Sequence, residues 1–243
     1  MIALEAKMRS DLIAAGMIHR WLSANASELL DGWGFERSEE LDGFLERVNG
    51  IMPGIDAQFT SQGAVARTAI ELWNLQDVVL LGGGMPTPLT PKPPQILYYT
   101  DLSPEVVNEV GQMGYNTRVA DVKNIEDLKN LTTARTALAT GLFHFLDDET
   151  AGLVLDNLAE AGFHTLVFNN MGTNIPEDLI VNWTKLGYKL IARAPEDVPR
   201  ILRSGWRMND ILTMPEFFRH NQQIGPKLME LSSIYHVYRL VRD

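Results

Sequence analysis

The sequence contains no cysteine, and this absence excludes several kinds of chemistry together. A chain without thiols forms no disulfide, binds no metal through thiolates and has no cysteine nucleophile. Its five histidines include no HxxxH or HxH pair, so these common spacings of metal ligands are absent as well. We therefore expect no metal site, and the lack of cysteine fits a reducing compartment such as the cytoplasm.

Long apolar runs and an excess of positive charge are missing too. No stretch approaches the roughly 20 apolar residues that span a bilayer, and the first residues, MIALEAKMRSDLIAAG, carry charges where a secretory signal is apolar. The net charge is −10 and the pI is about 5.0, which argues against broad contact with nucleic acid or an anionic membrane. We expect a soluble, cytoplasmic protein with neither of these partners.

The 243 residues are 45% hydrophobic and 21% charged, as in an ordinary globular protein with a sizeable core. The pattern changes near residue 59. Before that point we find only helical spacing, and we expect residues 1–58 to form a helical N-terminal cap. The cap either covers one face of a sheet or forms a lid over a ligand. A further helix is expected over 61–75, at the start of a domain spanning residues 59–243.

From Gln76 onward, strand-like and helix-like segments alternate, which predicts βαβ units and a three-layer α/β fold with a mostly parallel sheet. Ser103 and Asp147 are expected to cap helices, since each precedes a helical pattern. A helix is expected over 195–204, and a loop carrying "PEFFRHN" is expected between the last two strands. The expected strands are Asp77–Leu81, Ile96–Thr100, Arg118–Ala120, Ala134–Thr140, His164–Phe168, Asn209–Thr213 and Ile234–Val241.

Three features follow the first three strands. In an open parallel sheet, ligands bind beyond the carboxyl ends of the strands. Glycines at 82–84 allow the backbone to approach a ligand closely, Asp101 can accept both hydroxyls of a ribose, and Asp121 can meet an adenine amino group. A tight turn, a helix cap and a solvated loop residue explain each feature equally well alone. Together they predict a pocket shaped for adenosine.

The segments that carry these features resemble the class I S-adenosylmethionine-dependent methyltransferases over roughly Ser61 to Asp243. They are "VVLLGGGMP", "YYTDLSPEVV", "RVADVKNIEDL" and "ATGLFHFLDDE", followed by the ending "ILRSGWRMNDILT" and "SSIYHVYRLVRD". The resemblance implies a Rossmann-like sheet with a reversed C-terminal strand. Nicotinamide-dependent dehydrogenases share the first two features but usually lack this ending, so a dehydrogenase is the less favoured reading.

The resemblance also implies S-adenosyl-L-methionine as the cofactor and assigns residues to it. Gly82 and Gly84 would approach its amino-acid portion, and Thr140 and Gly141 would lie near the methionine portion. Asp101 would hold the ribose, Leu102 would pack beside the adenine, and Asp121 and Val122 would bracket the base. The implied cofactor-binding residues are Gly82, Gly83, Gly84, Asp101, Leu102, Asp121, Val122, Thr140 and Gly141.

A run of prolines departs from the family pattern. Relatives follow the glycines with a helix, whose N-terminus faces the cofactor carboxylate. Prolines lack an amide donor and clash with a preceding helical turn, so we expect this helix to be missing or shortened to about one turn. The prolines concerned are Pro86, Pro88, Pro91, Pro93 and Pro94.

Fewer residues point to the acceptor. His144 is a candidate base or acceptor-positioning residue, and a half-buried structural histidine is the alternative. Asn169 and Asn170 are candidate acceptor-binding residues, although a cap or a turn explains them equally well. Tyr98 and Tyr99 have opposite faces in a strand, so at most one could face a ligand, and core packing accounts for both.

These observations predict methyl transfer to a small-molecule acceptor by in-line displacement, in a pocket at the carboxyl ends of strands one to five. The segment Thr140-Gly-Leu-Phe stands where enzymes that methylate base amino groups carry Asn-Pro-Pro-Tyr, which also favours a small molecule. The alternative is a catalytically degenerate methyltransferase fold that serves as a binding or regulatory subunit. A homodimer is compatible with the sequence, which leaves the acceptor atom open.

Overall fold

The computed structural model describes residues 63–83, 89, 92–131, 133–175, 177, 180–181, 184, 189–219 and 235–243. The expected cap over residues 1–58, Gly84 and the prolines at 86, 88 and 91 lie outside the described residues.

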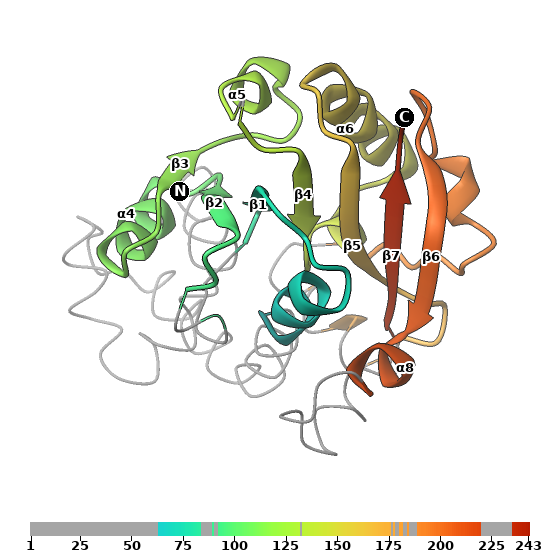
Figure 1. Cartoon of the computed structure of the whole chain (residues 1–243). Coiled ribbons are helices and arrows are strands. Elements are labelled where there is room, and N and C mark those ends of the chain that lie inside the picture. The colour runs from blue at the N-terminus through green and yellow to red at the C-terminus, as the bar shows by residue number, and fades with distance from the viewer. Residues whose placement is uncertain are drawn as a thin grey trace, which may run out of the picture.

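A seven-stranded sheet with the order β3-β2-β1-β4-β5-β7-β6 forms the centre of the protein (Figure 1). Neighbouring strands run parallel except for β7, which is antiparallel to both β5 and β6. The prediction of a mostly parallel sheet with a reversed C-terminal strand is therefore confirmed. The strands are β1 (Val78–Leu81), β2 (Ile96–Asp101), β3 (Thr117–Val119), β4 (Thr136–Ala139), β5 (Thr165–Met171), β6 (Arg207–Thr213) and β7 (Tyr235–Val241).

Helices connect the strands, and local sequence signals set where several of them begin. The side chain of Ser103 accepts the amide of Val106 at the start of α4, and Asp147 accepts the amide of Thr150 at the start of α6. Both predicted caps are confirmed. The helical segments are α4 (Pro104–Gln112), α5 (Ile125–Lys129), η2 (Phe143–Phe145), α6 (Asp148–Glu160), η3 (Val198–Arg200) and α8 (Met214–Phe218), with a further helix over residues 63–72.

The sheet separates two hydrophobic cores, because side chains alternate between its faces. Along β1, Val78 and Leu80 pack into one core, together with the helix over 63–72, α4 and α8. Val79 and Leu81 pack into the other, together with α5, α6 and η3. Figure 1 shows these helices on the two sides of the sheet. The resulting three-layer arrangement matches the predicted fold class.

Two predicted segments near the C-terminus differ from the structure. The segment beginning Met214-Pro215 is the helix α8 rather than a loop, because Thr213 and Glu216 cap each other's backbone amides and proline is well tolerated in a first helical turn. The helix expected over 195–204 is reduced to the single 3₁₀ turn η3. Pro199 would lie inside such a helix and has no amide to donate.

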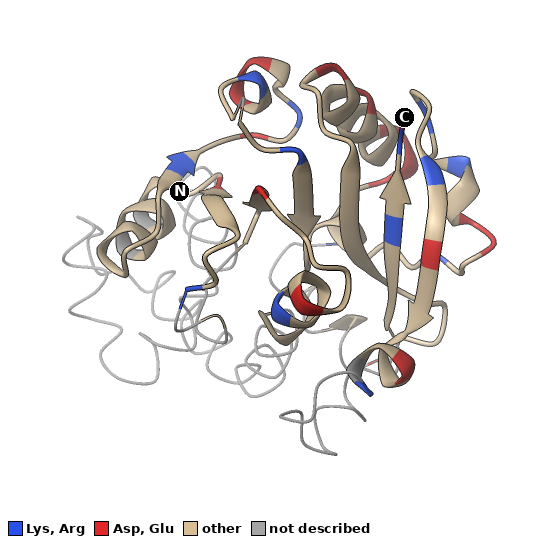
Figure 2. Cartoon of the chain, in the orientation of Figure 1, with Lys and Arg blue, Asp and Glu red and all other residues tan. Residues whose placement is uncertain are grey.

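The reversed strand pair is joined by charge as well as by its ladder. A guanidinium nitrogen of Arg239 on β7 lies 3.2 Å from a carboxylate oxygen of Asp210 on β6, and the same guanidinium lies 5.8 Å from the ring centre of Trp73. Figure 2 shows this blue and red pair beside each other, whereas the core of β4 and β5 carries no charged residue. The strands β6 and β7 therefore carry a charged pair, and β7 is hydrogen-bonded to the uncharged strand β5.

Leu155 on α6 provides a test of the second core. It is completely buried, whereas Leu153 on the same helix is 42% exposed. We expect Leu155→Ala to lower the free energy of unfolding by about 2–5 kcal/mol, because it removes buried apolar contacts and leaves a cavity. Leu153→Ala is the matched control and should change it by less than about 0.5 kcal/mol. Urea unfolding measures both, and equal effects would contradict the assigned core.

Candidate functional site

The register of the parallel strands brings the predicted site residues to one edge of the sheet. Leu81 of β1 lies opposite Thr100 of β2, and Ala139 of β4 lies opposite Phe168 of β5. The residues that come next in each strand or loop therefore follow along the same carboxyl edge. This edge includes the point between β1 and β4 where the strand order reverses, and open α/β sheets bind ligands at such points.

Glycine is required at each of the two described positions after β1, but for different structural reasons. Gly82 has a φ of 57°, a conformation that glycine adopts without strain, and Leu142 from beyond β4 lies against it. At Gly83, a Cβ atom would lie only 2.7 Å from Cε2 of Tyr99. Gly82 thus makes the turn and touches the segment after β4, while Gly83 leaves room for a tyrosine ring.

The predicted ribose-binding acid ends β2. Asp101 is only 2% exposed, and its Oδ1 accepts a hydrogen bond of 3.1 Å from the amide of Ser103. The next residue, Leu102, is 53% exposed, which makes it one of the larger apolar side chains open to solvent. A held carboxylate beside an exposed leucine suits a ligand with hydroxyl groups and a flat apolar ring.

Asp121 makes local contacts with Lys123, and Val122 is part of the second core. Oδ1 of Asp121 accepts the amide of Lys123 at 2.9 Å, and Oδ2 lies 3.8 Å from the ammonium of the same lysine. Val122 is buried in the second core, and its carbonyl accepts from the side chain of Asn157. Their proposed contacts with adenine stay a prediction beside these local contacts.

The segment after β4 is tied to β5 by an asparagine. Gly141, with a φ of 86°, donates its amide to Oδ1 of Asn169 at 2.7 Å. The side-chain nitrogen of Asn169 is buried and makes no hydrogen bond within the described part of the chain. Thr140 is buried beside it. The structure therefore brings Thr140, Gly141 and Asn169 together, as residues bordering one site must be.

Asn170 does not join this group. The strand β5 continues through both asparagines to Met171, so their side chains point to opposite faces of the sheet. The side chain of Asn170 donates to the carbonyls of Met171 and Ile191. From the sequence we expected this strand to end at Phe168, which is wrong. Binding of one acceptor by both asparagines does not fit their positions on opposite faces of the sheet.

Sequence reasoning missed Arg193, which organises this edge. Its side chain is 2% exposed. Its guanidinium donates to Oδ1 of Asp148 at 2.9 Å, to the carbonyl of Phe143 at 2.8 Å and to the carbonyl of Leu146. Its amide donates to the carbonyl of Met171 at 2.8 Å. An arginine among apolar residues in "LIARAPED" was the available signal, since arginine is rarely buried unless paired.

His144 lies on η2 within this network and is completely buried. Its ring contacts those of Phe145 and Tyr235, with centroid distances of 4.4 and 6.0 Å. Burial, followed by the nearby charge of Arg193, lowers the pKa of His144 to about 3. A general base works best when its pKa lies near the operating pH, so this environment favours a neutral, hydrogen-bonding imidazole over a proton acceptor.

The structure resembles known methyltransferases despite low sequence identity. A candidate methyltransferase from Thermobifida fusca matches with a TM-score of 0.57 at 16% identity, covering 83% of this chain and 86% of that one. A DUF574 family protein from Streptomyces avermitilis matches with a TM-score of 0.55 at 13% identity, covering 83% and 88%. Magnesium protoporphyrin IX methyltransferase from Synechocystis, solved with bound S-adenosylhomocysteine, matches with a TM-score of 0.51 at 15% identity, covering 89% and 95%.

The chain has the class I methyltransferase fold. The resemblance inferred from the sequence is thereby confirmed at the level of the fold. No protein-family model matches the chain, and no curated protein matches its sequence. The methyltransferase fold is therefore identified here by strand order and geometry.

A metal site and a membrane-spanning helix were both sought in the described part of this methyltransferase fold. Within the described ranges, no three His, Asp or Glu residues are grouped so that they could hold a metal ion. None of the helices described is both long and apolar enough to cross a membrane.

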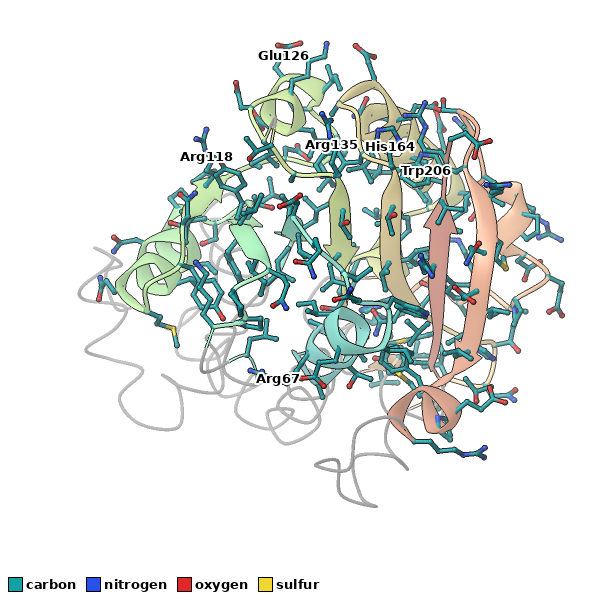
Figure 3. All side chains as sticks on the ribbon, in the orientation of Figure 1. Arg67, Arg118, Glu126, Arg135, His164 and Trp206 are labelled. Atoms are coloured by element: carbon teal, nitrogen blue, oxygen red, sulfur yellow. The ribbon has the colours of Figure 1, made fainter. Side chains whose placement is uncertain are left out.

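Figure 3 shows Arg135, His164 and Trp206 at a common edge of the fold, where β4 and β5 begin. This edge is opposite to the one that carries the candidate site.

The buried state of His144 predicts how stability depends on pH. An unfolded chain protonates this histidine near pH 6.5, whereas the folded protein does so only near pH 3. Between these values the unfolded state binds more protons, so the free energy of unfolding should fall as the pH is lowered, by up to about 1.4 kcal/mol per pH unit from this group. His144→Gln should reduce that slope in urea unfolding between pH 7 and pH 5.

Nuclear magnetic resonance of the imidazole provides the direct check. The His144 signal, assigned by its loss in His144→Gln, should not titrate between pH 8 and pH 5. A midpoint near 6.5 in the folded protein would show that the imidazole is exposed to solvent and would contradict the buried, neutral state.

Proposed function

We propose that this protein transfers a methyl group from S-adenosyl-L-methionine to a small-molecule acceptor. The observation that carries the proposal is the juxtaposition, at the reversal of strand order, of the Gly82 turn and the Asp101 carboxylate within a sheet whose β7 is reversed. The Synechocystis protein with the same fold was solved with S-adenosylhomocysteine, the demethylated cofactor.

The described residues fit an adenosyl group. Asp101 is held at the end of β2 by the amide of Ser103, and its carboxylate would accept the two ribose hydroxyls. The exposed Leu102 would cover a face of the adenine. The backbone at Gly82 and Gly83 has no side chain to obstruct the amino-acid portion. Asp121 and Val122 would border the base from the loop after β3.

The segment between β4 and α6 would border the methyl group and the acceptor. When bound, the cofactor supplies an electrophilic methyl group on a sulfonium, so the protein needs chiefly to align the acceptor and exclude water. Gly141, fixed by Asn169, would define the floor of this space. His144 would orient the acceptor as a neutral hydrogen-bonding group, since its pKa of about 3 disfavours proton uptake.

A small molecule is the favoured acceptor for two reasons. The net charge of −10 opposes the close approach of polyanionic nucleic acid. The segment after β4 reads Thr140-Gly141-Leu142-Phe143, and Phe143 is buried in the second core against Phe168. Because its ring is buried, Phe143 cannot stack on a nucleic-acid base, whereas an aromatic residue in a base-methylating site would need to do so.

Calorimetric titration tests the cofactor. We expect the wild-type protein to bind S-adenosylmethionine and S-adenosylhomocysteine but not NAD. Asp101→Asn keeps the size of the side chain and an acceptor for Ser103 but removes the charge that the ribose hydroxyls would meet. It should weaken both ligands by about 10- to 100-fold, the range expected for hydrogen bonds to a charged group.

Asp243→Asn is the matched control, because the Asp243 side chain is 92% exposed and its described ion pair is with Arg207 on β6. It should leave both affinities unchanged. Binding of NAD alone would favour a dehydrogenase instead. Absence of any binding at millimolar cofactor, in an otherwise folded protein, would favour a scaffold that has lost methyl transfer.

A further inference from the structure

The hydroxyl group of Tyr99 is a buried polar group for which the described part of the chain provides no hydrogen-bond partner. Tyr99 lies on β2 and is completely buried. A buried hydroxyl without a partner lowers stability, because it loses its hydrogen bonds with water. Such groups are rare in folded proteins, and each one calls for an explanation.

Its position suggests what that explanation is. A Cβ atom on Gly83 would lie 3.2 Å from the Tyr99 hydroxyl oxygen and 2.7 Å from Cε2 of its ring. The hydroxyl therefore lies directly against the backbone of the glycine turn. Tyr99 is also two residues before Asp101, on the same face of β2. The unpartnered group thus touches one proposed cofactor-binding element and neighbours another.

A second tyrosine beside it shows the contrast. The ring of Tyr115 meets that of Tyr99 edge to face, with centroids 5.9 Å apart. Tyr115 donates its hydroxyl to the carbonyl of Leu89 at 3.2 Å, so the fold itself satisfies this group. Two adjacent tyrosines thus have different hydrogen-bonding states: Tyr115 has a partner, and Tyr99, against Gly83, has none among the residues that the structure describes.

The surroundings make the Tyr99 hydroxyl a hydrogen-bond donor and place positive charge near its neighbour Tyr115. Burial raises the pKa of Tyr99 well above its ordinary value, so its hydroxyl is protonated and can donate. The ammonium of Lys92 lies 5.4 Å from the centre of the Tyr115 ring, and the charge of Arg67, which Figure 3 labels on the helix over 63–72, also acts on Tyr115. The Asp101 carboxylate, on the same face of β2, also raises the pKa of Tyr99 and so helps to keep its hydroxyl protonated.

We propose that the Tyr99 hydroxyl donates a hydrogen bond to the carboxylate of the amino-acid portion of bound S-adenosylmethionine. This inference rests on the proposed function. It also fits the sequence, because the prolines after the glycines supply no amide donors, and a side-chain donor would contribute what a helix N-terminus provides elsewhere. Tyr99 would be a cofactor-binding residue on a strand rather than in the loop.

The substitution Tyr99→Phe tests this with two ligands. S-Adenosylhomocysteine has the carboxylate, whereas 5′-methylthioadenosine has the same nucleoside and sulfur without the amino-acid portion. Calorimetry should show about a tenfold loss of affinity for the first and no change for the second. The ligand-free variant should be as stable as the wild type or more stable in urea, because it loses an unpartnered buried hydroxyl.

Tyr115→Phe is the matched control. It removes a hydroxyl that is bonded to Leu89, so it should lower the urea midpoint and change the affinity for both ligands by the same factor. A Tyr99→Phe variant with an unchanged ratio of the two affinities would overturn the inference, whether or not its stability changed. A wild-type protein that binds neither ligand would instead contradict the proposed function, and the inference would fall with it.

Discussion

The buried guanidinium of Arg193 is the interaction on which the carboxyl edge of the sheet depends. Removing a charge from water is costly unless it is paired and fully hydrogen-bonded, and Arg193 meets this condition through Asp148 and the carbonyls of Phe143 and Leu146. The segment after β4 must therefore follow a defined path. Through Leu142 this path reaches the turn at Gly82, so the hydrogen bonds of one buried guanidinium link the proposed acceptor side to the proposed cofactor side.

Beside this network, two buried polar groups at the candidate site have no hydrogen-bond partner among the described residues. The hydroxyl of Tyr99 lies at the glycine turn, and the side-chain nitrogen of Asn169 lies beside Gly141. Tyr99 lies on β2 and Asn169 on β5, and the apolar residues of both strands are packed in the two cores. The cores stabilise the fold, and the unpartnered groups reduce that stability, both at this edge and along β7, where Tyr235 and Tyr238 have buried hydroxyls without a described partner. At the candidate site, a ligand would complete the hydrogen bonds of Tyr99 and Asn169, as in a preorganised binding site.

Much of the fold could be predicted because its signals are local. Alternating strands and helices, the caps at Ser103 and Asp147 and the final strand pair each lie within a short segment, and all are confirmed. The helix α8 was missed because the whole segment between the last two strands was expected to be a loop, although proline is favoured in a first helical turn. The end of β5 was missed because asparagines are poor strand formers, whereas pairing with β7 extends the strand to Met171.

The sequence by itself determined which residues follow each strand, and hence that glycine, a carboxylate and an amide meet at one edge of a parallel sheet. It also excluded every chemistry that needs a thiol. Only the tertiary structure decided which polar groups find partners. Arg193 reaches carbonyls about 50 residues earlier in the chain. Tyr99 lies against Gly83, and its hydroxyl has no partner within the described ranges, whereas Tyr115 reaches Leu89. Strand periodicity indicates which face a side chain occupies, but the atoms it meets come from distant segments that only packing brings together.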